Sequence, residues 1–318
     1  MGGGQEVAVI VRPLVERDLP AATRIIRLAF GTFLGAPDPE NFWPELDYAR
    51  TRWLADPGAA FGAADDGELV GSNFATRWGS VGFFGPLTVR PDLWDRGIGK
   101  RLMEPVVARF DAWGVRHAGL FTFAHSPKHV GLYQKFDFWP RFLTAVMTKA
   151  VGPAESSSLS RYSELPPGGH EDCLNACRAV TDAVYDGLDV EREIRAVYAQ
   201  ELGDTVLLPT DGGLAGFAVC HCGPGTEAGN GSCYVKFGAV RPGPAANASF
   251  DRLLGACESL AARKGLSRLD AGVNLARHGA YRTMLQHGFR TAFQGVVMQR
   301  HNDAGYNRPD AYVIDDWR

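Results

Sequence analysis

The chain has 318 residues, which is enough for one large domain or two domains of ordinary size. Hydrophobic residues make up 45% and charged residues 22%, as in a globular protein, and the formal net charge is −3. This charge favours neither nucleic acid nor an anionic membrane as a partner. No uninterrupted apolar run reaches 18 residues, so we expect no spanning helix.

The cysteines and the start of the chain bear on its location. Residues 1–6 lack the basic and apolar regions of a secretory signal, so we expect reduced thiols and a cytoplasmic protein. All six cysteines lie in the second half, and the run Cys220-His221-Cys222 invites a metal interpretation. No second pair of Cys or His has ligand spacing, so we expect buried thiols there and no metal site.

The first half predicts elements in the order β-α-α-β-β-β-α-β-α-β. They are a strand over residues 7–13, helices over 21–30 and 40–54, two strands around the turn Asp65-Asp66-Gly67, a strand over 83–89, a helix over 102–113, a strand over 118–123, a short helix after Ser126 and a strand over 138–150. Asp18 is placed to cap the first helix and Gly114 to end the third. The small, polar residues 151–158 predict a linker.

The chain contains an internal repeat. A shift of 151 residues gives ten identities between positions 89 and 149 without a gap. The matched positions are Val89-Arg90-Pro91, Arg101-Leu102, Gly114, Phe138, Phe142 and Val146-Met147. Because the matches fall at strand ends, at a helix stop and in a final strand, they predict two structural copies of one domain.

The repeat continues upstream at a different shift. Asp66-Gly67 matches Asp211-Gly212 at a shift of 145. The difference of six residues predicts an insertion between the two matched regions, in the glycine-rich loop of residues 223–231.

One loop in the first copy has the features of an anion site. A strand ends at Val89, and Gly97-Ile98-Gly99 opens a helix. The first amides of a helix have no internal partners, and the helix dipole adds positive potential there. Arg96, Lys100 and Arg101 add positive charge nearby. The pattern predicts a phosphate-binding loop, with a plain strand-to-helix turn as the alternative.

Two phosphate-loop families are excluded by spacing. A Walker loop needs four residues between its glycines and a following Lys-Ser or Lys-Thr, which this chain lacks. A dinucleotide-binding fingerprint needs a third glycine, where this chain has Leu102.

The run Trp94-Asp95-Arg96-Gly97-Ile98-Gly99 resembles the pyrophosphate loop of the GNAT superfamily, the acyl-CoA-dependent N-acyltransferases, which follows the pattern Gln/Arg-x-x-Gly-x-Gly/Ala. Both glycines match, whereas Trp94 departs from the first position. A second piece also matches, with Leu132-Tyr133 on a short helix and Phe138 entering the last strand; Asp137 stands where the family has Gly. The order of elements is that of the family as well.

The resemblance implies a fold and a domain organisation. The fold is α/β (mixed α+β), with two tandem GNAT-like domains, each a central mixed twisted sheet flanked by helices. The expected divisions are an acyl-CoA-binding domain over 1–150, a linker over 151–158, a degenerate second domain over 159–302 and a tail over 303–318.

The resemblance also implies a cofactor site and a reaction. Acetyl-CoA or another acyl-CoA is the expected co-substrate, without a metal. The expected contacts are Leu87, Val89, Arg96, Gly97, Ile98, Gly99, Lys100 and Arg101. In this family an amine attacks the thioester directly, and Tyr133 is the expected acid for the leaving thiolate. The strand over 83–89 carries no carboxylate, so a water chain or His125 is the candidate to take the proton of the amine, with a capping or solvent-facing histidine as the alternative for His125.

The second copy has lost these features. At the shift of 151, Ala248 stands for Gly97, Phe250 for Gly99 and Met284 for Tyr133. A bulky ring in the loop opposes phosphate binding, so we expect no acyl-CoA there. Residues 311–317 are expected to pack as an edge strand.

Three functions are compared. The first is an enzyme that acetylates an amine of a small molecule or peptide, acting as a monomer or homodimer without nucleic-acid or membrane partners. The second is a non-catalytic acyl-CoA-binding or sensor protein, and the third is a scaffold that binds no CoA.

Overall fold

The computed structural model describes residues 9–153 and 159–318. Most of the predicted linker and the start of the chain lie outside these ranges. The chain forms two compact units, one running up to Thr76 and including Phe84–Gly114, the other made of Arg77–Phe83 and Val115–Arg318. The predicted domain boundaries describe sequence repeats, and they stay a prediction.

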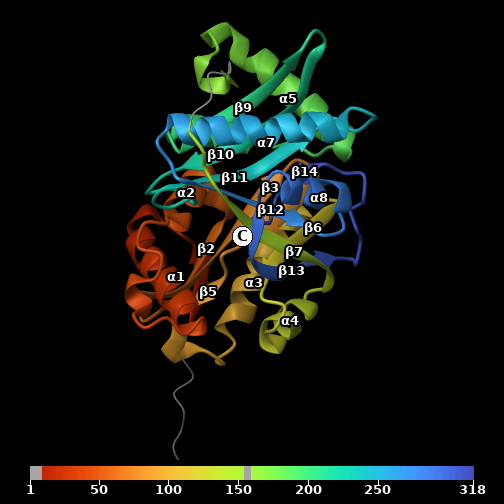
Figure 1. Cartoon of the computed structure of the whole chain (residues 1–318). Helices are drawn as coiled ribbons and strands as arrows, with labels where there is room; N and C mark the ends of the chain where they lie inside the picture. The colour runs from red at the N-terminus through yellow and green to blue at the C-terminus, as the bar shows by residue number, and fades with distance from the viewer. Residues whose placement is uncertain (1–8, 154–158) are drawn as a thin grey trace, which may run out of the picture. The chain divides into compact units, whose positions relative to one another are not determined.

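The first unit is an antiparallel sheet with three helices (Figure 1). Its elements are β1 (Ile10–Pro13), β2 (Ala60–Asp65), β3 (Glu68–Trp78, whose last two residues belong to the second unit), β5 (Thr88–Val89), α1 (Leu19–Phe33), α2 (Tyr48–Ala55) and α3 (Ile98–Trp113). Ile25 and Ile26 of α1 pack with Leu69 and Phe74 of β3 in an apolar core. This core holds α1 on the sheet.

Three local predictions are wrong in this part of the chain. The helix expected over residues 40–54 begins only at Tyr48, because Asp47 accepts a hydrogen bond from the Arg50 amide and caps it there. Asp18 does not cap α1, because its carboxylate pairs with Arg12. The strand expected over residues 83–89 is two strands, β4 (Val81–Phe84) and β5, with residues 85–87 between them.

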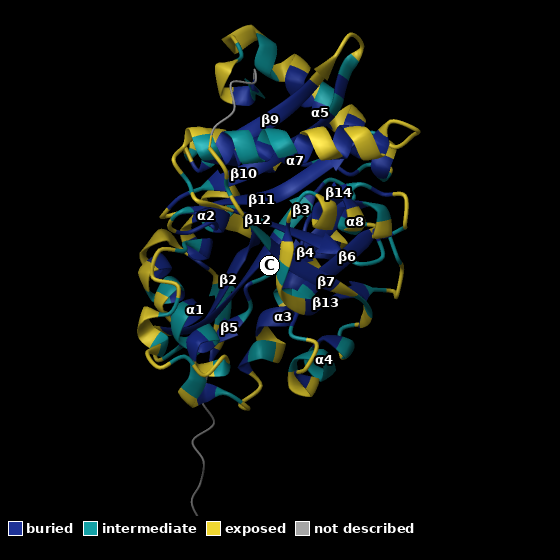
Figure 2. Cartoon of the chain, in the orientation of Figure 1, coloured by how far each residue is buried: buried dark blue, intermediate teal, exposed yellow. Residues whose placement is uncertain are grey.

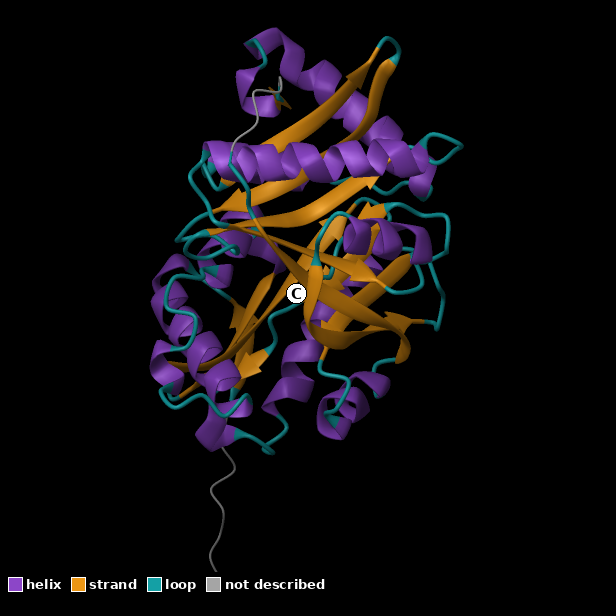
Figure 3. Ribbon diagram, viewed as in Figure 1, coloured by secondary structure: helices purple, strands orange, loops and turns teal. Residues whose placement is uncertain are grey.

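The second unit is a mixed sheet in the order β4-β6-β13-β7-β12-β11-β10-β9-β8, drawn in orange in Figure 3. The strands are β4 (Val81–Phe84, of which Phe84 belongs to the first unit), β6 (His117–Thr122), β7 (Phe138–Ala150), β8 (Ser160–Arg161), β9 (Gly203–Thr210), β10 (Gly213–Cys222), β11 (Ser232–Val240), β12 (Arg268–Asn274), β13 (Arg290–Arg300) and β14 (Val313–Ile314). The helices are α4 (Pro127–Gln134), α5 (His170–Val184), α6 (Glu191–Ala199), α7 (Ala246–Arg263) and α8 (His278–Gln286).

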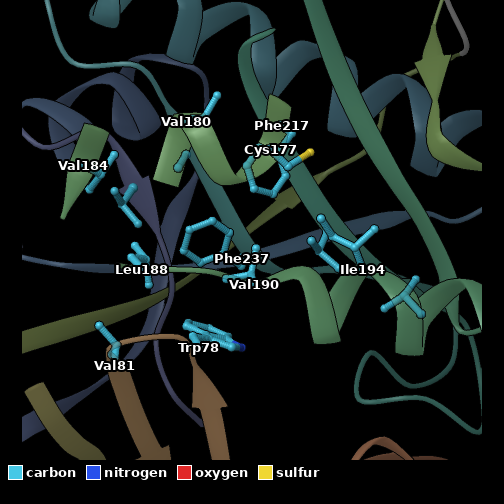
Figure 4. Close-up of a cluster of buried hydrophobic side chains, with 14 of the residues drawn as sticks. Trp78, Val81, Cys177, Val180, Val184, Leu188, Val190, Ile194, Phe217 and Phe237 are labelled. Atoms are coloured by element: carbon cyan, nitrogen blue, oxygen red, sulfur yellow. The ribbon is translucent and has the colours of Figure 1, made fainter. Parts of the chain in front are cut away.

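Helices cover both faces of the sheet around β10, whose residues are almost all buried (Figure 2). Because successive side chains of a strand point to opposite faces, Phe217 contributes to the core with α5 and Ala218 to the core with α7. Figure 4 shows the core on the α5 side, where the ring of Phe237 packs against both Trp78 and Phe217, with 5.2 Å and 5.8 Å between centroids. Burial on both faces explains why residues 214–222 form a continuous apolar run.

Strand pairing repeats at the predicted shifts. In the second unit, β4 pairs with β6 in parallel, through Val81↔His117 and Phe83↔Gly119. When 151 is added to each residue number, these pairs become Ser232↔Arg268 and Tyr234↔Asp270, which are pairs between β11 and β12. In the first unit, β2 and β3 form a hairpin. When 145 is added to their residue numbers, the paired residues are those of the hairpin of β9 and β10, and the irregularity in register falls at the equivalent place. The mixed α/β fold is confirmed, and the repeat predicted from sequence is found in the backbone pairing.

The last strand of each repeat pairs with its own equivalent. β7 and β13 correspond at a shift of 151, and they lie antiparallel, with Phe138↔Arg300 and Thr148↔Arg290 at the ends of the pairing. Two equivalent antiparallel strands have the geometry of a two-fold interface. Each strand also pairs with the other repeat, β13 with β6 and β7 with β12, so the two repeats exchange their last strands.

The end of the sequence forms β14, which is not an edge strand. It pairs with β11, a strand that already has β10 and β12 as neighbours. The expectation of an edge strand over residues 311–317 is therefore wrong. Within the described residues, no helix is long and apolar enough to cross a membrane.

Candidate functional site

The predicted anion loop leads into α3. Gly97 is the residue before the helix and has φ = 77°, in the left-handed region that glycine adopts without strain. A side-chain carbon placed on Gly97 would meet no atom within 4 Å, so the space beside the loop backbone is open. The first internal bond of the helix joins Arg101 N to Gly97 O at 3.2 Å. The amides before Arg101 are therefore at the free end of the helix.

Trp94 has a structural role in the loop. Its indole Nε1 donates to the carbonyl oxygen of Val89 at 2.8 Å. The bond ties the loop to the end of β5, so Val89 and the loop are held together. Trp94 departs from the family pattern, and its hydrogen bond connects the predicted anion loop to β5.

Positive charge surrounds the loop. Arg96, Lys100 and Arg101 are exposed, and within the described chain none of them forms an ion pair. The first turn of α3 has no acidic residue. A dianionic group at this helix end would be attracted by the helix dipole and by the three exposed cations.

The strand behind the loop supports it from inside. Ile98 and Leu102 are buried, and the side-chain amide of Asn73 donates a hydrogen bond to the Leu102 carbonyl oxygen at 3.2 Å. A side-chain carbon on Gly71 would lie 2.7 Å from the Thr88 oxygen, so glycine allows β3 and β5 to approach. Leu87, at the start of this segment, is half-buried. The eight predicted cofactor residues thus all belong to the first unit.

Tyr133 lies in α4 of the second unit. Ser126 begins this helix, as predicted, by accepting a hydrogen bond from the His129 amide at 3.4 Å. The Tyr133 side chain is buried, and burial raises the pKa of its phenol well above the ordinary value, partly offset by a hydrogen bond with Thr122. The phenol therefore stays protonated at any working pH, ready to donate a hydrogen bond.

Two histidines accompany Tyr133 in the second unit. His125 is exposed, at the end of the segment that follows β6. His129 is half-buried one helical turn before Tyr133, and burial, together with Lys128 and His125, lowers its pKa. A neutral imidazole can accept a proton. No motif in the sequence singles out His129, although its spacing of four from Tyr133 places both on one face of α4.

The equivalent loop of the second repeat is built differently. α7 begins at Ala246, so Ala248, the counterpart of Gly97, lies inside the helix. Phe250, the counterpart of Gly99, is fully buried in the core. Asp251 is exposed and lies 3.1 Å from His287. The positions equivalent to Gly97 and Gly99 carry no glycine; the positive-φ glycine of this loop, Gly243 with φ = 138°, lies three residues before α7.

Buried charges in the second repeat satisfy one another. Lys236 of β11 lies 2.9 Å from Glu193 and 2.8 Å from Glu227. Burial alone would raise the pKa of Glu193, but Lys236 and His221 lower it to about 2. His221 accepts a hydrogen bond from the Glu227 amide, and all six cysteines are free. No group of three or more His, Cys, Asp or Glu in the described residues is placed to hold a metal.

The protein has a mixed α/β fold with repeated strand pairing, and the loop before α3 is its predicted anion site. Residues 24–138 match the model of the family described as the acetyltransferase (GNAT) family. The match assigns a GNAT acetyltransferase domain to this part of the chain, and members of the GNAT superfamily use acetyl-CoA and act on amine acceptors. No curated protein matches the chain in sequence.

Solved structures share the fold over nearly the whole chain. One is a Pyrococcus horikoshii protein provisionally named an acetyltransferase, with a TM-score of 0.68 and 15% identity, covering 97% of this chain and 95% of its own. Another is a GCN5-related N-acetyltransferase from Sphaerobacter thermophilus, with a TM-score of 0.62 and 19% identity, covering 92% and 95%. At these identities the likeness concerns the fold.

Proposed function

We propose that the protein is an N-acetyltransferase that moves the acetyl group of acetyl-CoA to an amine of a small molecule or peptide. The observation that carries this proposal is the open, left-handed Gly97 at the start of α3. Its backbone amides and the cations Arg96, Lys100 and Arg101 fit a pyrophosphate. The second repeat, without such a loop, does not bind the cofactor in this proposal.

The reaction is a direct transfer. A neutral amine attacks the thioester carbon, the carbon–sulfur bond breaks, and the sulfur leaves as a thiolate. Because an ordinary thiol has a pKa of about 8.5, full proton transfer from the buried phenol of Tyr133 would be uphill. Tyr133 instead donates a hydrogen bond to the thiolate, which stabilises charge as it develops.

The proton lost by the amine needs an acceptor. Residues 83–89 carry no carboxylate, so the candidates are the two histidines near Tyr133. His125 is exposed, whereas His129 has a lowered pKa and is neutral at neutral pH. We propose that one of them takes the proton, directly or through water.

A non-catalytic acyl-CoA-binding protein is the second candidate, favoured by the absence of a carboxylate on residues 83–89. Release of free CoA thiol from acetyl-CoA, measured with a panel of small amines and peptides, separates the two. The enzyme releases thiol only when an acceptor is present, and a Gly97→Glu/Gly99→Glu variant abolishes this release. Binding of acetyl-CoA without release for any amine would favour the second candidate.

A further inference from the structure

The second repeat contains an extended segment where the first repeat has its cofactor residues. β11 and β12 pair in parallel only from Ser232↔Arg268 to Val235↔Ala271. Beyond this point β11 pairs instead with β14, through Gly238↔Ile314 and Ala239↔Val313.

The position of this segment follows from the shift of 151. Gly238 and Val240 are the counterparts of Leu87 and Val89, two of the residues assigned to the cofactor in the proposed function. Gly238 pairs with Ile314, and the Val240 amide donates to the Tyr312 oxygen at 3.2 Å. The segment therefore follows the strand along which the cofactor residues lie in the first repeat.

The segment also reaches the degenerate loop. The ring of Tyr312 packs against Phe250, the counterpart of Gly99, with 5.4 Å between centroids. The Gly279 amide, in the first turn of α8, donates to the Pro309 oxygen at 3.1 Å. Thus Phe250, whose ring stands where the first loop has Gly99, contacts the segment that contains Tyr312.

Buried polar groups hold the segment in place. Arg277 is 1% exposed and donates to the Val313 oxygen at 3.1 Å and to the Asp315 carboxylate at 2.8 Å. The Tyr234 hydroxyl donates to Asp316 at 2.7 Å. A side-chain carbon on Gly272 would lie 2.2 Å from Asp316, so glycine makes room for it. Main-chain pairing with side-chain anchors is how sheets bind extended peptides.

We propose that residues 309–318 are an internal ligand of the second repeat, occupying the course that acyl-CoA takes in the first. The comparison with acyl-CoA rests on the proposed function. The second repeat is thus a peptide-binding site for this segment, and it is closed to acyl-CoA both by the segment and by the altered loop.

Hydrogen exchange in the whole chain tests this proposal. Arg277→Met removes the bonds to Asn307, Val313 and Asp315, and Arg268→Met, which removes the ion pair with Asp270, is the control variant. We expect Arg277→Met to speed amide exchange in residues 309–318 by about tenfold or more, while β11 and β12 keep their protection. The control variant and saturating acetyl-CoA leave exchange of the segment unchanged.

Three outcomes would overturn the proposal. Equal acceleration in the segment, β11 and β12 would make residues 309–318 part of one cooperative core. Unchanged amide exchange of residues 309–318 in Arg277→Met would show that Arg277 does not hold the segment. Faster exchange of the segment with acetyl-CoA would show that the cofactor competes for its place.

A cleavage experiment checks the same proposal independently. A protease site inserted between Asn302 and Asp303, in an exposed turn, severs the segment after folding. We expect the severed segment to co-elute with the protein and to exchange with a labelled peptide of residues 303–318. Its immediate loss, or unfolding on cleavage, would contradict the proposal. Failure of acetyl-CoA to bind would defeat the proposed function but would not affect retention of the segment.

Discussion

The indole nitrogen of Trp94 and the carbonyl oxygen of Val89 are joined by a hydrogen bond of 2.8 Å that closes the anion loop. Trp94→Phe keeps a ring and removes this bond. Since one hydrogen bond contributes about 1 kcal/mol, we expect acetyl-CoA to bind about fivefold more weakly, with little change in the unfolding midpoint. Calorimetric titration measures the affinity, and unchanged binding would show that the bond does not organise the loop.

Gly97 and Gly114 flank α3 and offer a matched pair. Both have positive φ, 77° and 62°, and both have open space where a side-chain carbon would stand. Changing either to Ala forces a left-handed conformation that costs about 1 kcal/mol. We expect similar losses of stability in the two variants, but a loss of acetyl-CoA affinity of about tenfold or more only in Gly97→Ala. Equal affinities would contradict the assignment of the loop.

Tyr133 and Thr122 separate a catalytic from a structural role. Tyr133→Phe removes the proposed hydrogen-bond donor, and Thr122→Val removes only the hydrogen bond between Thr122 and Tyr133. Loss of one donor to a developing anion typically lowers kcat about 100-fold. We therefore expect Tyr133→Phe to lower kcat strongly with KM little changed, and Thr122→Val to have a small effect. Equal effects of both variants would make Tyr133 structural.

The pH dependence of the rate distinguishes the two histidines. A base must be deprotonated, so the rate falls on the acid side as the base takes up a proton. Because the pKa of His129 is lowered by burial, we expect the rate to hold to mildly acidic pH, and His129→Ala to abolish this limb. His125→Ala is the control variant. A profile that His129→Ala leaves unchanged, and that His125→Ala alters, would assign the base to His125.

His117 makes stability depend on pH. It is fully buried in β6, and burial lowers its pKa to about 4, against the effects of Asp303 and Asp315. The unfolded chain therefore binds a proton near pH 6.5 that the folded chain takes up only near pH 4. Stability falls as pH decreases through this window, by up to about 3 kcal/mol at 1.4 kcal/mol per pKa unit.

Denaturant titrations of the unmodified chain and of His117→Gln at several pH values measure the contribution of His117 to the free energy of unfolding. The variant has no ionisable ring, so we expect it to lose less stability than the unmodified chain between pH 7 and pH 4. Parallel losses in the two proteins would show that His117 does not carry the dependence.

Short-range patterns predicted much of this structure. Gly97 was recognised from sequence because a glycine-x-glycine pattern between a strand and a helix lets an anion approach the backbone, and Gly114 because a left-handed turn at a helix C-terminus favours glycine. Ser126 was recognised as a cap for the same local reason. The repeat was visible because equivalent glycines and apolar residues recur at fixed shifts. Residues 40–47 were predicted wrongly, because their aromatic spacing resembles a helix while Asp47 starts the helix later.

Long-range pairing was not predictable in the same way. The alternation in β7 and β13 indicates strands, but it does not say that β13 pairs with β6. Both last strands have similar apolar faces, with Val146-Met147 matching Val297-Met298. The sequence therefore does not show whether each last strand pairs within its own repeat or with the other repeat. Arg277 donates hydrogen bonds to Val313 and Asp315, and no local pattern in the sequence reveals this contact.

Calorimetric titration of the purified chain with acetyl-CoA tests the central claim most directly. The account predicts one site per chain, located in the first repeat and lost in the Gly97→Glu/Gly99→Glu variant. Two sites per chain would show that the loop around Phe250 still binds the cofactor. No binding at all would contradict the enzyme and leave a scaffold with the GNAT fold.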